Sequence, residues 1–216
     1  VLAVIGVLGT TEFGTVDPIH EIVRLRDDWA ERGCHFGVHA DAAWGGYLAS
    51  IFRSPDGGFR DREELRAEYK YFPSELVHDS FKALGECDSI TVDPHKLGYV
   101  PYAAGAFLCR NRDVVDFLTQ RAAYVFDLGA SDEQVAPGDK RDFRAMVNAV
   151  RAERIETLGT AGFFLKHRDL NPPKVLVPAS AHYSWEKGMK VLGFGTANLV
   201  KVGVDDHMRM EPGHLA

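Results

Sequence analysis

The sequence lacks several features that mark particular classes of protein. Its 216 residues include three cysteines, Cys34, Cys87 and Cys109, an odd number without a CxxC spacing. We therefore expect reduced thiols in a cytoplasmic protein rather than a disulfide framework. No GxGxxG follows an apolar, strand-like run, which argues against a Rossmann-type nucleotide binder. We also predict no metal site.

Long hydrophobic runs and a strong charge bias are missing as well. The apolar run over residues 1–8 is too short to span a bilayer, and it has neither a basic start nor a cleavage site. The formal net charge is −6, and acidic and basic residues are interspersed. These properties predict neither a nucleic-acid partner nor a membrane partner. With 45% hydrophobic residues, a chain of this length is expected to bury a substantial core.

The sequence does contain an alternation of strand-like and helix-like segments. Residues 1–9 form a continuous apolar run, residues 19–32 have apolar side chains at helical spacing, and Gly33 ends that helix. Residues 36–40 form the next strand, so the order predicts a βαβ unit in an α/β fold with a mainly parallel sheet. Further helices are expected over 74–84, 114–125 and 184–192, further strands over 89–92, 103–109, 174–178 and 199–204, an exposed excursion over 53–73, and the least regular structure over 130–173.

Polar side chains follow three of these predicted strands. Asp41 follows the second strand, Lys96 ends the run Asp93-Pro94-His95-Lys96, and His182 follows residues 174–178. Open α/β sheets bind ligands at the carboxyl ends of their strands. A carboxylate there suits a charged flat ring, and a partly desolvated amine can form a Schiff base with a carbonyl cofactor. The alternatives are that Asp41 caps a helix, Lys96 is a solvated surface lysine and His182 is structural.

The segments resemble the group II amino-acid decarboxylases that depend on pyridoxal 5'-phosphate (PLP). The resemblance covers residues 1–126 and 174–212 and implies the large domain of a fold-type-I PLP-dependent transferase, with a mainly parallel sheet flanked by helices. It also implies a homodimer, for which Phe13, Trp44 and Tyr47 would suit the contact. The motifs that carry it are Gly9-Thr10-Thr11-Glu12-Phe13-Gly14, His39-Ala40-Asp41-Ala42-Ala43, Asp93-Pro94-His95-Lys96 and, closest to bacterial tyrosine decarboxylases, residues 93–102 and 123–126.

The resemblance implies a role for four residues around the cofactor ring. Lys96 would hold PLP as a Schiff base. Asp41 would pair with the ring nitrogen and keep it protonated, so that the ring accepts electrons as carbon dioxide leaves. His182 would stack on one face of the ring, and Ala43 would pack on the other.

Four further residues have less specific roles by resemblance. Thr11 would lie near the ring hydroxyl, and His95 near the phosphate or the Schiff base. Tyr102 and Tyr124 are candidates for the acid that protonates the substrate carbon after carbon dioxide has left. The alternative is that both tyrosines pack as ordinary aromatic side chains.

The segments stand in a different order from that of the family, in which the counterpart of residues 174–212 comes first. A circular permutation or a joining of pieces of a longer chain would explain this. We find no N-terminal arm, no Gly/Ser/Thr phosphate segment and no C-terminal small domain. We therefore divide the chain into residues 1–130 (PLP-binding core with the Schiff-base lysine), 131–173 (an unplaced segment or junction) and 174–216 (the stacking-histidine segment of the same domain).

The implied function is decarboxylation of an L-amino acid, tyrosine as first choice, to the amine and carbon dioxide. A glutamate decarboxylase or a related PLP lyase is the alternative within the same class. An inactive remnant with a structural or binding role is the alternative from another class. The missing phosphate segment favours the remnant, whereas the presence of Lys96, Asp41 and His182 argues against it.

Overall fold

A computed structural model of the protein describes residues 1–112 and 152–215. The strands are β1 (Ala3–Val7), β2 (Gly37–Asp41), β3 (Ser89–Val92), β4 (Ala106–Cys109), β5 (Val175–Pro178) and β6 (Leu199–Val202). The α-helices are α1 (Ile19–Glu31), α2 (Arg62–Glu68), α3 (Glu75–Ala83), α6 (Ile155–Lys166) and α7 (Ser184–Val191). Short 3-10 helices cover η1 (Gly45–Phe52), η2 (Leu84–Glu86), η4 (Thr196–Asn198) and η5 (Pro212–Leu215).

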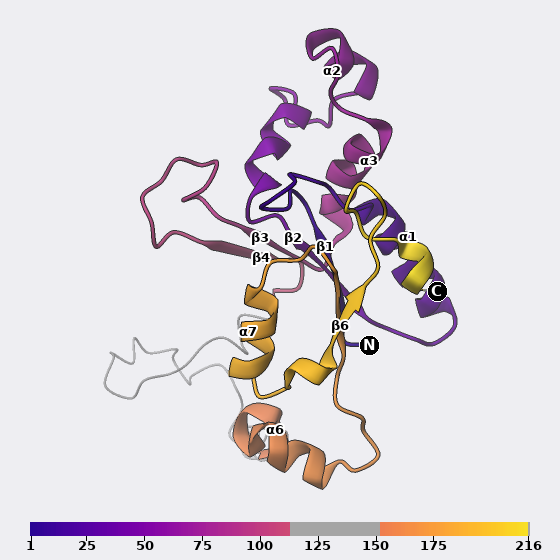
Figure 1. The fold of residues 1–216 in the computed structure, drawn as a ribbon, viewed down its shortest axis with the longest axis vertical. Coiled ribbons are helices and arrows are strands. Elements are labelled where there is room, and N and C mark those ends of the chain that lie inside the picture. The colour runs from indigo at the N-terminus through magenta and orange to yellow at the C-terminus, as the bar shows by residue number, and fades with distance from the viewer. Residues whose placement is uncertain (113–151, 216) are drawn as a thin grey trace, which may run out of the picture.

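In the described part of the chain, six strands form one sheet in the order β4-β3-β2-β1-β5-β6. Every neighbouring pair is parallel except β3 and β4, which are antiparallel. Val4 of β1 is in register with Val38 of β2 on one side and with Leu176 of β5 on the other. The predicted α/β fold with a mainly parallel sheet flanked by helices is therefore confirmed, and residues 175–202 share this sheet with residues 3–109 (Figure 1).

The two faces of the sheet are packed separately. Successive side chains of a strand point to opposite faces. Val4 and Val38 accordingly belong to one core cluster, together with residues of α1 and α3, whereas Ile5 belongs to a second cluster with Val177 and with Met189 of α7. Helices α1 and α3 thus cover one face, and α7 covers the other (Figure 1). The elements on the α7 face position the site described below.

Helix α1 forms because its apolar residues recur at helical spacing. Ile19, Ile22 and Val23 are buried against the sheet, which contributes roughly 1.5–3 kcal/mol for each fully buried side chain. The helix ends before Gly33, whose φ of 79° lies in the left-handed region that glycine adopts without strain. The predicted helix boundaries therefore agree with the structure.

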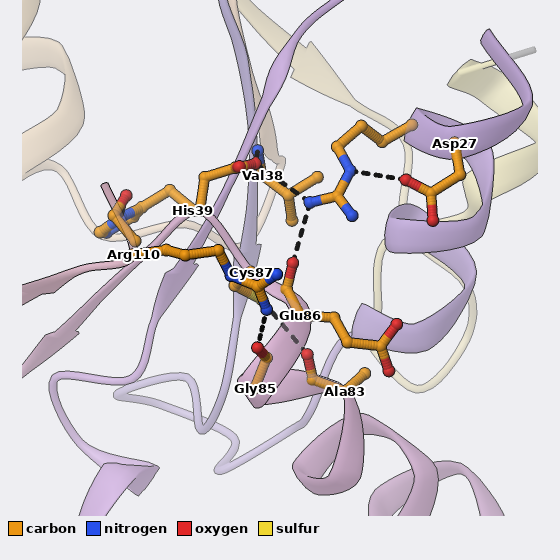
Figure 2. A network of polar contacts seen from close by, with 11 residues as sticks. Asp27, Val38, His39, Ala83, Gly85, Glu86, Cys87 and Arg110 are labelled. Atoms are coloured by element: carbon orange, nitrogen blue, oxygen red, sulfur yellow. Dashed lines mark hydrogen bonds and ion pairs between the residues drawn. The ribbon is translucent and has the colours of Figure 1, made fainter. Parts of the chain in front are cut away.

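Arg26 links helix α1 to the beginnings of strands β2 and β3. Arg26 donates to the carbonyl of Glu86 at 2.8 Å and to Asp88 Oδ2 at 3.1 Å, and it pairs with Asp27 on its own helix. Asp88 Oδ2 also accepts the backbone N–H of Val38 at 2.8 Å. Figure 2 shows this network between α1, η2 and the start of β2. Because it joins three elements, it helps to fix how α1 lies along the sheet.

Two irregular segments contain more structure than expected. Residues 53–73 are mostly exposed, as expected, but they include α2, and Leu65 is fully buried in the same core cluster as Phe52. The scattered apolar residues of this stretch pack together with aromatic rings, which charge content alone did not indicate. Helix α6 lies within the stretch expected to be least regular. The helix expected over residues 114–125 lies outside the described residues.

Candidate functional site

A pocket of about 400 Å³ lies at the carboxyl edge of the sheet. Strands β1, β2 and β3 are parallel, so their carboxyl ends meet at the same edge. The loops that follow them form one side of the pocket, and the segment from Ser180 to the first turns of α7 forms the other. Five of the predicted site residues line this pocket: Thr11, Asp41, Ala43, Lys96 and His182.

A close approach of two loops shapes the pocket beneath Thr11. The N–H of Gly45 donates to the carbonyl of Leu8 at 3.0 Å, and a Cβ at position 45 would overlap this carbonyl. Gly9 has a φ of 95°, a conformation that favours glycine. Only glycine at position 45 lets the loop after β2 lie directly on the loop after β1.

Asp41 ends β2 and holds two hydrogen bonds within the protein. Its Oδ2 accepts the indole N–H of Trp185 at 3.1 Å, and its Oδ1 accepts the backbone N–H of Ala43 at 3.3 Å. Each carboxylate oxygen has two lone pairs, so acceptor capacity remains for a ligand. The carboxylate is thus oriented and still able to bind a cationic N–H.

Lys96 follows β3 in a tight turn. Its Nζ lies 2.9 Å from Asp93 Oδ2, and its side chain is 30% exposed. The N–H of Asp93 donates to the carbonyl of Ala43, which joins this turn to the loop after β2. A Cβ at Gly98 would lie 2.6 Å from the carbonyl of Pro94, so the turn requires glycine there. The amine therefore has a fixed position at the pocket wall.

His182 lies on the loop between β5 and α7. Its Nδ1 accepts the backbone N–H of Ser184 at 3.3 Å and lies 3.0 Å from the Ser184 hydroxyl. Because Nδ1 is an acceptor, the proton of the neutral ring is on Nε2. The flat ring thus forms part of the pocket wall across from the loops of Asp41 and Ala43.

His39 supports the floor beside Asp41. Its Nδ1 lies 2.8 Å from the Ser89 hydroxyl, and its Nε2 lies 3.1 Å from the Thr91 hydroxyl. Burial lowers the pKa of His39 below its usual range, and the nearby Asp41 carboxylate opposes this shift. A neutral imidazole with both nitrogens hydrogen-bonded is held in one orientation, and it supports the Trp185 ring that packs on it.

Two predicted residues among those described, His95 and Tyr102, do not line the pocket. His95 bonds through Nδ1 to the carbonyl of Ala104 at 2.7 Å, and its ring lies 4.6 Å from that of Tyr102. The side chain of Tyr102 is 88% exposed. Tyr124 lies outside the described residues. The roles suggested for these three residues stay predictions.

Several pocket residues were not assigned a role from the sequence, among them Trp185 and Asp93, which contact assigned residues. Asp93 stands three residues before Lys96 in the same motif, and Trp185 stands three residues after His182 on α7. The spacing of three was the available signal, because it places two side chains on one side of a turn or helix. The bond from Trp185 to Asp41 links residues 144 positions apart, so no local pattern predicts it.

The donor set of the pocket fits PLP. Lys96 offers an amine for the aldehyde, Asp41 a carboxylate for the ring nitrogen, His182 a flat ring for one face of the cofactor ring, and Ala43 a small side chain for the other. Hydroxyls of Thr10, Thr11, Ser180 and Ser184 line the same pocket. Within residues 1–112 and 152–215, no cluster of three or more His, Cys, Asp or Glu side chains is arranged to hold a metal ion. None of the helices described is long and apolar enough to cross a membrane.

The sheet and the pocket define an α/β protein whose edge site joins an amine, a carboxylate and an imidazole. Its relatives are amino-acid decarboxylases. The chain is 41% identical over 139 residues to the L-tyrosine decarboxylase of Enterococcus faecalis, covering 60% of this chain and 22% of that enzyme. It is 31% identical over 131 residues to the aspartate 1-decarboxylase of Aliivibrio fischeri, covering 61% and 19%. The predicted resemblance to decarboxylases is therefore confirmed, whereas the permuted order stays a prediction.

The coverage of these relatives is partial. The chain spans 22% of the length of the L-tyrosine decarboxylases that it matches. A solved structure, the glutamate decarboxylase domain of a diaminobutyrate-pyruvate transaminase and L-2,4-diaminobutyrate decarboxylase from Vibrio parahaemolyticus, is 27% identical, with a TM-score of 0.35 over 56% of this chain and 20% of that one. No protein-family model matches the chain.

Proposed function

We propose that this chain is the cofactor-binding core of a PLP-dependent amino-acid decarboxylase of fold type I. The observation that carries the proposal is the meeting of Asp41, Lys96 and His182 in one pocket. These residues come from three segments that are far apart in the sequence, and each lies at or after the carboxyl end of a strand of the same sheet. The similarity to L-tyrosine decarboxylases over 60% of the chain supports the same function.

In this proposal Lys96 holds the cofactor covalently, and Asp41 binds the proton of its ring nitrogen through the carboxylate. When bound, PLP supplies a ring that withdraws electrons from the carbon that loses carbon dioxide. Trp185 and the N–H of Ala43 orient the carboxylate for this contact. Asp93, 2.9 Å from the Lys96 amine, is placed to hold a proton of that amine.

The remaining pocket residues orient the ring and exclude water. His182 and Ala43 would pack on opposite faces of the PLP ring. Thr11 would form a hydrogen bond with the hydroxyl group of that ring. By resemblance, His95 would lie near the phosphate or the lysine linkage. By resemblance, Tyr102 or Tyr124 would supply the proton that replaces the departing carboxylate. The assignments of His182, Ala43 and Thr11 rest on the resemblance together with their placement in the pocket, and those of His95, Tyr102 and Tyr124 rest on the resemblance alone.

The proposed substrate is tyrosine, and the products are the amine and carbon dioxide. The higher identity to relatives named L-tyrosine decarboxylase than to one named aspartate 1-decarboxylase supports this choice. The proposal includes a homodimer in the cytoplasm. The free thiols of Cys34, Cys87 and Cys109 suit a reducing compartment, and exposed Phe13, Trp44 and Tyr47 suit a contact between copies.

The test is to add PLP to the purified chain, record the visible spectrum, reduce with borohydride and map the modified peptide. We expect a visible band of bound cofactor and a label on Lys96. Lys96→Ala should abolish both. The matched control is Lys187→Ala, because Lys187 lies on α7 with its Nζ over the Tyr183 ring, 4.7 Å from the ring centroid, and should label no more than other surface lysines.

A label scattered over surface lysines would contradict the proposal and favour the non-catalytic remnant. If Lys96 is labelled, release of carbon dioxide from tyrosine, aspartate and glutamate should be compared. Release from glutamate or aspartate without release from tyrosine would overturn the choice of substrate and leave the cofactor site intact.

A further inference from the structure

Trp185 joins the two halves of the pocket through one hydrogen bond. Its indole N–H donates to Asp41 Oδ2 at 3.1 Å, across from helix α7 to the end of β2. Both residues line the pocket, and the bond joins positions 144 residues apart. The hydrogen bond to an ionised acceptor is of the stronger kind, so it constrains both partners.

Packing contacts within the protein fix the position of the Trp185 indole ring. The indole and the His39 ring, with centroids 5.7 Å apart, adopt the T-shaped arrangement that aromatic pairs favour. His39 is itself fixed by the hydroxyls of Ser89 and Thr91. Trp185 also packs against the core cluster of Ile5, Val177 and Met189. The direction of the N–H is therefore set by packing and does not depend on a ligand.

The Asp41 carboxylate is consequently oriented by two donors, one for each oxygen. The Ala43 N–H bonds to Oδ1, and the Trp185 N–H bonds to Oδ2. A single donor would let the carboxylate rotate about χ2, a torsion that is broad in aspartate. Two donors from different elements hold its plane in one orientation.

We propose that Trp185 is a positioning residue that acts through Asp41 on the bound cofactor. This inference rests on the proposed function, because Asp41 is the partner of the ring nitrogen there. Trp185 keeps the remaining lone pairs of the carboxylate aimed into the pocket, and it couples their direction to the position of α7. Loss of the indole N–H thus weakens cofactor binding while the core stays packed.

The first measurement needs no cofactor. In the nitrogen-15 labelled chain, the indole N–H resonance of Trp185, identified with Trp185→Phe, is compared between wild type and Asp41→Ala. We expect the chemical shift of this N–H in Asp41→Ala to be that of an indole with a weaker hydrogen bond. The indole of Trp29, on the opposite face of the sheet, is the internal control and should not move. If the Trp185 indole N–H has the same chemical shift in wild type and in Asp41→Ala, the inference is overturned.

The second measurement is a PLP titration of wild type, Trp185→Phe, Asp41→Ala and the double variant. Phenylalanine keeps an aromatic ring on His39 and removes the N–H. We expect Trp185→Phe to raise the dissociation constant about tenfold, as for a lost charged hydrogen bond. In the Asp41→Ala background the same change should have no further effect, because its target is gone. Trp29→Phe is the control and should bind PLP like wild type.

The outcomes separate this inference from the proposed function. Equal PLP affinity of wild type and Trp185→Phe, with Lys96 labelled in both, would overturn the positioning role and leave the cofactor site standing. An equal loss in the wild-type and Asp41→Ala backgrounds would show a merely structural role for the ring and would overturn it too. A wild-type chain without label on Lys96 would overturn the proposed function and, with it, the role of Trp185 toward a cofactor.

Discussion

At the scale of single residues, Asp17 shows what a buried carboxylate contributes next to the site. It is 1% exposed, and its two oxygens accept the backbone N–H groups of Val7 at 2.7 Å and Met210 at 2.6 Å. Its own carbonyl accepts the Ser80 hydroxyl. Asp17 thus ties β1 to the turn that ends at Met210. The carbonyl of Met208 in this turn accepts the hydroxyl of Ser180 at the pocket wall.

The pH dependence of stability should report on Asp17. Burial raises its pKa from 3.8 to about 6, and the N–H groups of Met210 and Val7 partly oppose the shift. The folded state then binds more protons than the unfolded state between about pH 4 and 6. The unfolding free energy should therefore fall as pH rises through this window, by about 3 kcal/mol for this group. Urea unfolding of wild type and Asp17→Asn from pH 4 to 7 measures the difference.

Only the difference between the two proteins isolates Asp17, because other groups titrate in the same window. The buried His39, with its lowered pKa, contributes a slope of the opposite sign. Asp28→Asn, a change at an exposed position of α1, is the control and should keep the wild-type slope. If Asp17→Asn keeps that slope too, Asp17 does not titrate near pH 6.

At the residue scale, sequence patterns placed the amine, the carboxylate and the imidazole of the pocket but not the hydrogen bonds within it. Asp41, Lys96 and His182 were each predicted to follow a strand, and all three line one pocket. The roles assigned to them stay predictions. Trp185 was not assigned, because its bond to Asp41 depends on the sheet order, which places β5 and α7 beside β1 and β2. Sheet order is a property of the folded chain and has no local signal.

At the scale of elements, the contact between the loops after β1 and β2 depends on one glycine. A Cβ at Gly45 would overlap the carbonyl of Leu8, which accepts the Gly45 N–H. Gly45→Ala should lower the unfolding free energy by about 1–3 kcal/mol, since the backbone must shift. It should also weaken PLP binding, because Thr11 and Ala43 lie on the two loops. Urea unfolding and PLP titration measure the two effects.

The matched control for this change is Gly85→Ala, where an added Cβ meets no atom within 4 Å. That variant should stay within about 0.5 kcal/mol of wild type. A Gly45→Ala variant as stable as the control would show that the two loops can move apart at little cost.

Elements with strong periodicity were predicted well, and elements with weak periodicity were not. The spacing of Ile19, Ile22 and Val23 indicated α1, and Ser74 caps α3 by accepting the Val77 N–H at 3.3 Å. Helix α6 was not predicted, since its sequence includes Gly159 in a non-helical conformation. Helix α2 is short and charged, and the burial of Leu65 depends on distant aromatic residues.

At the scale of the whole molecule, one sheet unites the segments whose order along the chain we predict to differ from that of the family they resemble. Strand β5 pairs with β1, and the N–H of Leu2 donates to the carbonyl of Lys174 at 2.8 Å. Val1 and Leu215 line the same surface pocket, so the two ends of the described chain lie near each other. A connection between them would therefore not need to cross the sheet.

A circular permutant should accordingly keep the fold. Joining Ala216 to Val1 by a short Gly/Ser linker, with new ends between the exposed residues Asn171 and Pro172, leaves every strand pair intact. We expect its thermal midpoint to stay within about 3 °C of wild type, since closing a short loop costs little. We also expect PLP and borohydride to label Lys96 as in wild type.

A permutant opened within β2, between Val38 and His39, is the control and should not fold, because it divides a central strand beside the Asp41 site. If the first permutant fails as the control does, the order of the segments matters for folding, and the relation to the family order by a simple permutation is wrong.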